Sequence, residues 1–98
     1  MITLAMWEIQ RRHSGHWFDP NTNRFFKTRL CQDGYAKREG SDAFFVSSEQ
    51  APGRERRWSV RRLKWVDGDI STVGAGFQGY GNIRAAKKAA QGLAASDV

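Results

Sequence analysis

The sequence predicts an α+β domain: a twisted antiparallel β-sheet of four to six strands with one C-terminal α-helix packed on a face. Several short segments alternate apolar and polar residues between turns that contain glycine, proline or asparagine, which is typical of antiparallel strands. One alanine-rich segment near the end favours a helix. With 98 residues, 40% of them hydrophobic, the chain is expected to form a single domain over residues 1–98.

Five segments carry strand-like patterns. Trp7 and Ile9 alternate with polar residues, and the turn-forming run DPNTN separates this segment from a second one that is rich in phenylalanine. Three more strand-like segments follow, separated by the turns APGRE and VDGD: FFVSSE, RRWSVRRLKW and ISTV. The expected strands cover residues 5–12, 24–30, 44–49, 56–66 and 69–74. Residues 32–42 are expected to form a loop, with room for a short strand around Tyr35.

The segment over residues 56–66 contains a phase conflict. Its apolar side chains fall on both parities of a strand: Trp58, Val60, Leu63 and Trp65. A regular strand directs alternate residues to opposite faces, so it cannot bury all four against one core. One extra residue near Arg61 and Arg62, a β-bulge, would restore the phase. The basic side chains of the strand would then lie on the face opposite the core.

Residues 82–95 form the expected helix. Alanine dominates this segment, and Asn82 is a favourable N-cap residue. The apolar stripe at helical spacing comprises Ile83, Ala86, Ala90 and Leu93. Arg84, Lys87 and Lys88 fall largely on the opposite side. We therefore expect the helix to lie across one face of the sheet with its small residues inward.

Positive charge is concentrated in one run, Arg54 to Lys64. It holds six of the sixteen basic residues against the single acid Glu55, so most of the formal net charge of +6 lies there. Guanidinium groups at strand spacing suit successive phosphates, which predicts non-enzymatic binding of nucleic acid. The candidate contact residues are Arg54, Arg56, Arg57, Arg61, Arg62, Lys64, Arg84, Lys87 and Lys88. A solvated edge strand, charged so that it resists pairing with other sheets, would show the same composition.

The same charges are compatible with a second function. A basic strand would also suit a protein-interaction module or inhibitor that docks on an acidic surface of a host protein, such as a defence factor or a polymerase. An exposed edge strand would also allow two chains to pair as a homodimer. A partner is therefore expected in either case, and it is a nucleic acid or an acidic protein.

The remaining motifs do not predict an enzyme. GAGFQG, over residues 74–79, has the GxGxxG spacing of dinucleotide-binding loops but lacks the parallel βαβ unit and the acidic residue that complete such a site. His13, His16 and Asp19 lack a fourth strong metal ligand. Cys31 is the only cysteine, so there is no intramolecular disulfide, and no motif activates it as a nucleophile. We therefore expect no metal and no cofactor.

No segment predicts a membrane span. A transmembrane helix needs about 20 consecutive apolar residues, and no stretch approaches that length. No basic-then-apolar leader opens the sequence either. The expected location is the cytoplasm.

The chain contains four short motifs, followed by an alanine-rich basic helix: FFKTR, FFVSSEQ, RRWSVR and ISTVGAGFQGY, in that order. These motifs resemble those of a family of small uncharacterised proteins of tailed bacteriophages and prophages. The resemblance implies a phage or prophage accessory protein in a bacterial host and lends no activity. The helix segment IRAAKKAAQGLA is also similar to the last helix of double-stranded RNA-binding domains. Arg84 and Lys87 would match two of its basic positions, whereas Ile83 departs at the first.

Overall fold

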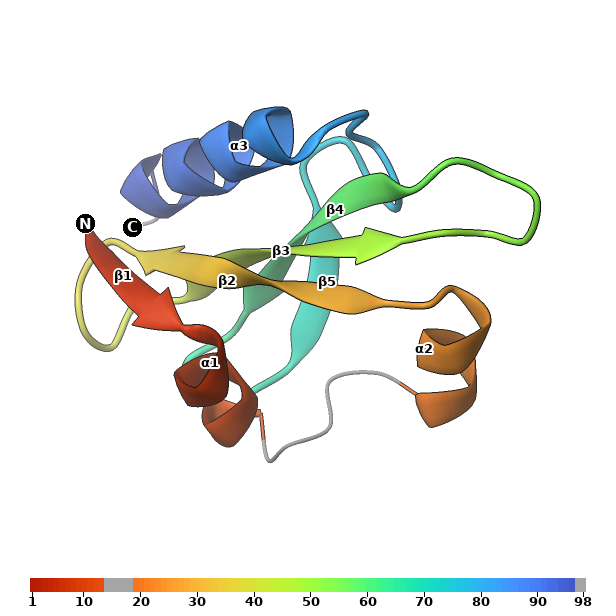
Figure 1. The fold of residues 1–98 in the computed structure, drawn as a ribbon. Coiled ribbons are helices and arrows are strands. Elements are labelled where there is room, and N and C mark those ends of the chain that lie inside the picture. The colour runs from red at the N-terminus through yellow and green to blue at the C-terminus, as the bar shows by residue number, and fades with distance from the viewer. Residues whose placement is uncertain (14–18, 97–98) are drawn as a thin grey trace.

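The computed structural model describes residues 1–13 and 19–96, which form a five-stranded antiparallel sheet flanked by helices (Figure 1). The strands are β1 (Ile2–Ala5), β2 (Arg29–Ala36), β3 (Ala43–Glu49), β4 (Arg57–Leu63) and β5 (Ile70–Val73). The helices of the described part are α1 (Met6–Arg12), α2 (Pro20–Phe25) and α3 (Ile83–Ser96). Neighbouring strands in the chain are also neighbours in the sheet, and an isolated antiparallel bridge joins Tyr80 to Trp58 of β4. The predicted α+β class with a C-terminal helix is confirmed.

Helix α3 covers one face of the sheet. Its three fully buried residues are Ala86, Ala90 and Ala94. They pack against side chains of β2, β3 and β4: Tyr35, Phe44, Val46 and Val60. The side chain of Asn82 caps the helix, because its Oδ1 accepts a hydrogen bond from the N–H of Ala85 at 2.8 Å. Small residues on the inner stripe let the helix backbone approach the sheet closely, as the composition predicts.

Helix α1 covers part of the opposite face. Ile9 is buried there in a second core with Leu4, Ala36, Ala43, Phe45 and Leu63. Gly34 on β2 makes this contact possible, since a Cβ atom at this position would lie 2.3 Å from Cδ1 of Ile9. Both faces of the central strands are therefore covered, and β3 is buried along its whole length.

Two of the predicted strands are wrong. Residues 6–12 form helix α1, in which Ile9 faces the core while Trp7 is 64% exposed. Residues 20–25 form helix α2, which begins with Pro20 and is capped by the carboxylate of Asp19 through the N–H of Thr22 at 3.0 Å. The second strand starts only at Arg29 and continues through the segment that was expected to be a loop.

The predicted β-bulge in β4 is also wrong. The pairing of β4 with β3 runs without interruption from Arg57 to Leu63. The bulge lies instead in β2, between Leu30 and Gly34. A regular β4 is tolerated because both of its faces are buried, with Val60 on the α3 side and Leu63 on the α1 side. Trp65 follows the strand and is partly exposed, with the guanidinium of Arg12 stacked 4.2 Å from its ring centroid.

The other predicted elements are confirmed within small shifts of their ends. They are strand β3, the central part of strand β4, strand β5 and helix α3. No helix in residues 1–13 and 19–96 is long and apolar enough to cross a membrane.

Candidate functional site

The nine basic residues predicted as a site do not form a continuous stripe. Arg54, Arg56 and Arg57 lie at the end of the molecule where β3 turns into β4, and Arg84 lies in the first turn of α3. Arg61 lies inside the protein. Three others lie near carboxylates or at the far end of β4: Arg62, Lys64 and Lys87. Lys88 is exposed on α3, one helical turn beyond Arg84.

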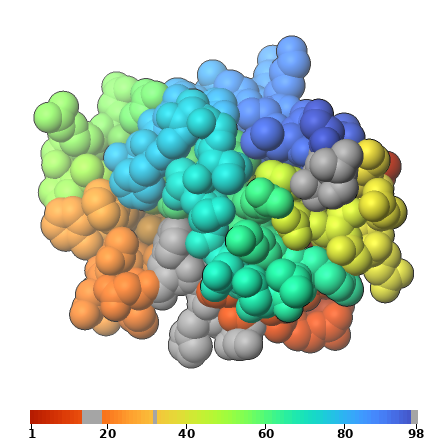
Figure 2. Space-filling model, turned by 180° about the vertical axis from the view of Figure 1, so that it is seen from behind, coloured from red at the N-terminus to blue at the C-terminus, as the bar shows by residue number. Residues whose placement is uncertain are grey.

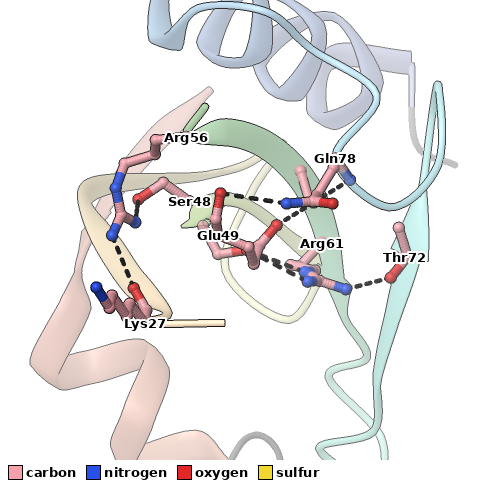
Figure 3. A network of polar contacts seen from close by, with 9 residues as sticks. Lys27, Ser48, Glu49, Arg56, Arg61, Thr72 and Gln78 are labelled. Atoms are coloured by element: carbon pink, nitrogen blue, oxygen red, sulfur yellow. Dashed lines mark hydrogen bonds and ion pairs between the residues drawn. The ribbon is translucent and has the colours of Figure 1, made fainter. Parts of the chain in front are cut away.

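Arg61 is the centre of a buried polar cluster. Its side chain points to the sheet face opposite α3 and only 1% of the residue is exposed. Its Nη2 lies 3.4 Å from Oε2 of Glu49, and its Nε donates to the hydroxyl of Ser47 at 3.0 Å (Figure 3). A further hydrogen bond reaches the hydroxyl of Thr72. The prediction that the strand displays its guanidinium groups outward is therefore wrong at Arg61.

The charges of this cluster are held by hydrogen bonds. The hydroxyls of Ser47 and Ser59 each donate to the carboxylate of Glu49 at 2.5 Å. Burial lowers the pKa of Arg61 from its ordinary value, while the nearby carboxylate of Glu49 acts in the opposite direction. The pair is thus a structural ion pair inside the protein, where neither group is available to a ligand in solution.

The GAGFQG segment covers this cluster. The N–H of Gln78 donates to the hydroxyl of Ser59 at 2.7 Å, and its side-chain amide donates to the carbonyl of Glu49 at 3.2 Å (Figure 3). The ring of Phe77 lies 5.3 Å from the guanidinium carbon of Arg61. Gln78 adopts a left-handed backbone conformation with φ of 55° to make these contacts. The segment is therefore a connection that seals the buried ion pair.

Asp42 neutralises Arg62 at the far end of β4. The carboxylate accepts hydrogen bonds from Nε of Arg62 at 2.7 Å and from the N–H of Trp65 at 2.9 Å. Burial alone would raise the pKa of Asp42, but these hydrogen bonds and the positive charges of Arg62 and Lys64 together hold it below its ordinary value. Lys64 is exposed at this end. On α3, Lys87 lies 3.6 Å from the carboxylate of Asp33.

The guanidinium groups at the β3–β4 turn are held by backbone carbonyls and a hydroxyl. Arg56 donates to the hydroxyl of Ser48 at 2.8 Å and to the carbonyl of Lys27 at 3.0 Å (Figure 3). Arg57 donates through Nε to the carbonyl of Gln78 at 2.6 Å. These contacts orient both groups and leave most of their N–H donors available.

The tertiary structure adds two basic residues that the sequence reasoning missed. Lys27 follows α2 and is joined to Arg56 through its carbonyl. Arg29 begins β2 opposite Ser48, the residue that also accepts from Arg56. We name this set the hairpin-end cluster: Lys27, Arg29, Arg54, Arg56, Arg57 and Arg84. In Figure 2, α2, the β3–β4 turn and the segment that leads into α3 lie side by side at one end of the molecule.

The hairpin-end cluster is positively charged with little compensation. Among the described residues no carboxylate forms an ion pair with any of its six members, in contrast to Arg61, Arg62 and Lys87. The one acidic residue within the β3–β4 turn is Glu55, which is exposed. An uncompensated group of cations at one end attracts anions and steers their approach.

Two exposed phenylalanines accompany these cations. Phe25 at the end of α2 is 57% exposed, and Phe77 is 46% exposed. Both contact the ring of Phe26 edge to face, at centroid distances of 4.8 Å and 5.1 Å. The predicted strand over residues 24–30 included Phe25, so the sequence did not identify this ring as a surface residue at the end of a helix.

The described part of the chain shows no arrangement of side chains that supports the metal-site or nucleophilic-cysteine candidates. Residues 1–13 and 19–96 contain no group of three His, Cys, Asp or Glu side chains that would hold a metal ion, and His16 lies outside these residues. Cys31 is partly buried against the α3 core, and burial raises the pKa of its thiol. Less of the nucleophilic thiolate is therefore present at neutral pH.

Comparisons with known proteins place the chain in a family without providing an activity. No curated protein and no solved structure matches it. The model of one protein family matches residues 3–91, which include β2 to β5, all of β1 except Ile2, and most of α3. The chain therefore belongs to DUF7447, a family of unknown function.

Proposed function

We propose that the protein binds nucleic acid without catalysing a reaction, and that the hairpin-end cluster contacts the phosphates. The observation that supports this most strongly is the presence of six cations at one end with no ion pair to a carboxylate of the described residues. Affinity of such a surface for nucleic acid comes mainly from release of counterions by neutralised phosphates. Arg56 and Arg57 are already oriented by hydrogen bonds, so binding orders them at a small entropic cost.

The proposed surface differs from the one that the sequence suggested. It omits Arg61, Arg62 and Lys87, because the protein's own carboxylates engage them. It omits Lys64, the residue that follows β4, which lies about 23 Å from Arg57 at roughly 3.3 Å per residue. Lys88 extends the surface along the exposed side of α3. The resemblance to phage and prophage proteins favours a role as an accessory factor in the cytoplasm of a bacterial host.

The conformation of Lys27 supports a role for its charge. Helix α2 ends in a Schellman-type pattern, since the N–H of Thr28 bonds to the carbonyl of Asn23 at 2.9 Å and that of Lys27 to the carbonyl of Arg24 at 3.2 Å. Lys27 occupies the left-handed position with φ of 46°, where glycine is the usual residue. A lysine in this strained backbone conformation, where glycine would be unstrained, favours a functional role for its side chain.

Lys27→Gly is expected to stabilise the fold and to weaken binding. Glycine relieves the left-handed strain, which raises the free energy of unfolding by up to about 1 kcal/mol. Removal of the ammonium group lowers affinity for a single-stranded oligonucleotide and reduces the salt slope by somewhat less than one unit. Urea unfolding and fluorescence anisotropy measure the two effects. Unchanged affinity in Lys27→Gly would remove Lys27 from the contact surface, and Lys27→Arg should bind like the native chain.

A charge-matched pair of triple variants tests the proposed function. The first carries Lys27→Gln, Arg54→Gln and Arg84→Gln in the hairpin-end cluster, and the control carries Arg11→Gln, Lys37→Gln and Arg38→Gln elsewhere. Both lose the same net charge, and all six side chains are exposed. We expect the first to bind random oligonucleotides at least about tenfold more weakly and to reduce the slope of log K against log salt by about two. The control should change both quantities far less.

Two outcomes would reject the proposed function. Equal losses in the two triple variants would show that net charge, and not this surface, attracts the oligonucleotide. Failure of the native chain to bind single-stranded or duplex oligonucleotides at low salt would exclude nucleic acid as the partner. The second outcome would favour the alternative partner, an acidic surface of a host protein, for which the same cations provide steering.

A further inference from the structure

We infer that the hairpin-end cluster takes single-stranded nucleic acid, whose bases stack on Phe77 and Phe25 while its phosphates meet the surrounding cations. The inference rests on the proposed function and specifies its ligand. Its starting point is the exposure of two large rings beside the cluster, 57% for Phe25 and 46% for Phe77. Exposed rings next to a basic groove are the usual platform for unpaired bases.

The ring of Phe77 is held in place before any ligand arrives. Its centroid lies 5.1 Å from that of Phe26 at an interplanar angle of 73°, and 5.3 Å from the guanidinium carbon of Arg61. The next residue, Gln78, is tied to Ser59 and Glu49 by its backbone and side-chain hydrogen bonds. A ring fixed in this way loses little freedom when a base stacks on it, so the stacking energy is retained in the affinity.

The cations and the exposed rings are linked through neighbouring residues of the chain. Arg57 donates through Nε to the carbonyl of Gln78, the residue that follows Phe77 in the chain. Lys27 follows Phe25 and Phe26, and its carbonyl accepts from Arg56. Phe26 contacts both exposed rings, so Phe77 and Phe25 belong to one aromatic cluster at this end of the molecule.

The combination of cations with exposed rings favours a single strand over a duplex. In a duplex the bases are stacked on one another and directed inward, so the surface offers phosphates and groove edges but no free base faces. The exposed rings would then remain without a partner. A single strand brings phosphates and unpaired base faces together, and every base has a π-face, so little sequence preference is expected.

Fluorescence anisotropy with three matched probes tests the inference. The probes are a mixed-sequence single-stranded oligonucleotide, a duplex of that sequence and an abasic strand of equal length that keeps the phosphates. We expect the native chain to bind the single strand more tightly than the other two. Phe77→Ala should weaken single-strand binding by about 5- to 150-fold, the range for loss of one stacked base. Its salt slope and its affinity for the duplex and abasic probes should stay near the native values.

Variants of the same ring separate stacking from folding. Phe77→Trp should keep or raise single-strand affinity, whereas Phe77→Leu, which keeps apolar volume over Arg61, should lose it. Circular dichroism and a thermal melt establish that each variant folds, and Phe25→Ala repeats the test at the second exposed ring. Trp7→Ala, at an exposed ring on α1, is the matched control.

The possible failures are distinguishable. Equal affinity of the native chain for the single strand and the abasic strand, or preference for the duplex, would overturn the inference and leave the proposed function intact. The same holds if Phe77→Leu and Phe25→Ala both fold and bind the single strand like the native chain. Absence of binding to all three probes would reject the proposed function itself.

Discussion

Replacement of Glu49 by glutamine is expected to lower the free energy of unfolding by about 3–5 kcal/mol. The side chain keeps its size but loses the charge that faces the guanidinium of Arg61 at 3.4 Å. Both residues are essentially inaccessible to water, so the buried guanidinium of Arg61 would lose the carboxylate that faces it. A small domain has about 5–15 kcal/mol of stability in total, so this one change removes a large part of it.

Urea unfolding followed by circular dichroism measures this effect. Glu39→Gln, at an exposed residue of the turn between β2 and β3, is the matched control and should change stability by less than about 0.5 kcal/mol. The double variant Glu49→Leu with Arg61→Met removes both charges and should recover part of the loss, because no unpaired ion is left in the interior. A loss below about 1 kcal/mol in Glu49→Gln would contradict a buried, charged pair.

The same variant should also disturb the proposed ligand surface. Glu49 holds the hydroxyl of Ser59, which in turn accepts from the N–H of Gln78. Phe77 precedes Gln78 and packs over Arg61, so its position depends on the ion pair beneath it. Arg61 is therefore outside the proposed contact surface, yet it is expected to affect binding through Phe77.

Replacement of Ala90 by leucine is expected to destabilise the protein by about 1–3 kcal/mol. Ala90 is fully buried where α3 crosses the sheet, in the core that contains Val46 and Val60. Extra methylene groups would force the helix away from the strands or drive side chains out of their preferred rotamers. Leucine and alanine are both good helix formers, so helix propensity contributes little to the difference.

Ala85→Leu is the matched control for this prediction. Ala85 lies in the same helix but is exposed, so the substitution should leave the urea midpoint nearly unchanged. Ala90→Leu should also weaken oligonucleotide binding, because displacement of α3 moves Arg84 relative to the rest of the hairpin-end cluster. Equal stability of the two variants would show that α3 does not pack on the sheet through its alanine stripe.

Some parts of the fold are predictable because their determinants are local. Asn82 and the alanines that follow it determine α3 within the segment itself, through a cap and helix propensity. The run FFVSSE is recognisable as a strand, and the structure shows it as the fully buried β3. The N-terminal segment was misread because Trp7 and Ile9 fit an alternating pattern, although Ile9 packs as part of a helix.

Which of the basic residues are exposed could not be predicted from the sequence, for a different reason. Arg57 and Arg61 stand in similar basic surroundings along the chain, but one is exposed and the other is buried. The pairing of β3 with β4 places Glu49 beside Arg61. Residues 74–79 then cover this face of the two strands and bury the pair. Lys27 likewise joins Arg56 across 29 positions of the chain.

The sequence alone thus determined the α+β class, the C-terminal helix and an excess of positive charge around β4. Local propensity and net charge are properties of short segments, so they can be read without coordinates. Only the tertiary structure decided which cations are neutralised inside the protein and which remain exposed at the hairpin end. That distinction depends on burial and on partners distant in the chain, because a charge is compensated by whatever carboxylate the fold places beside it.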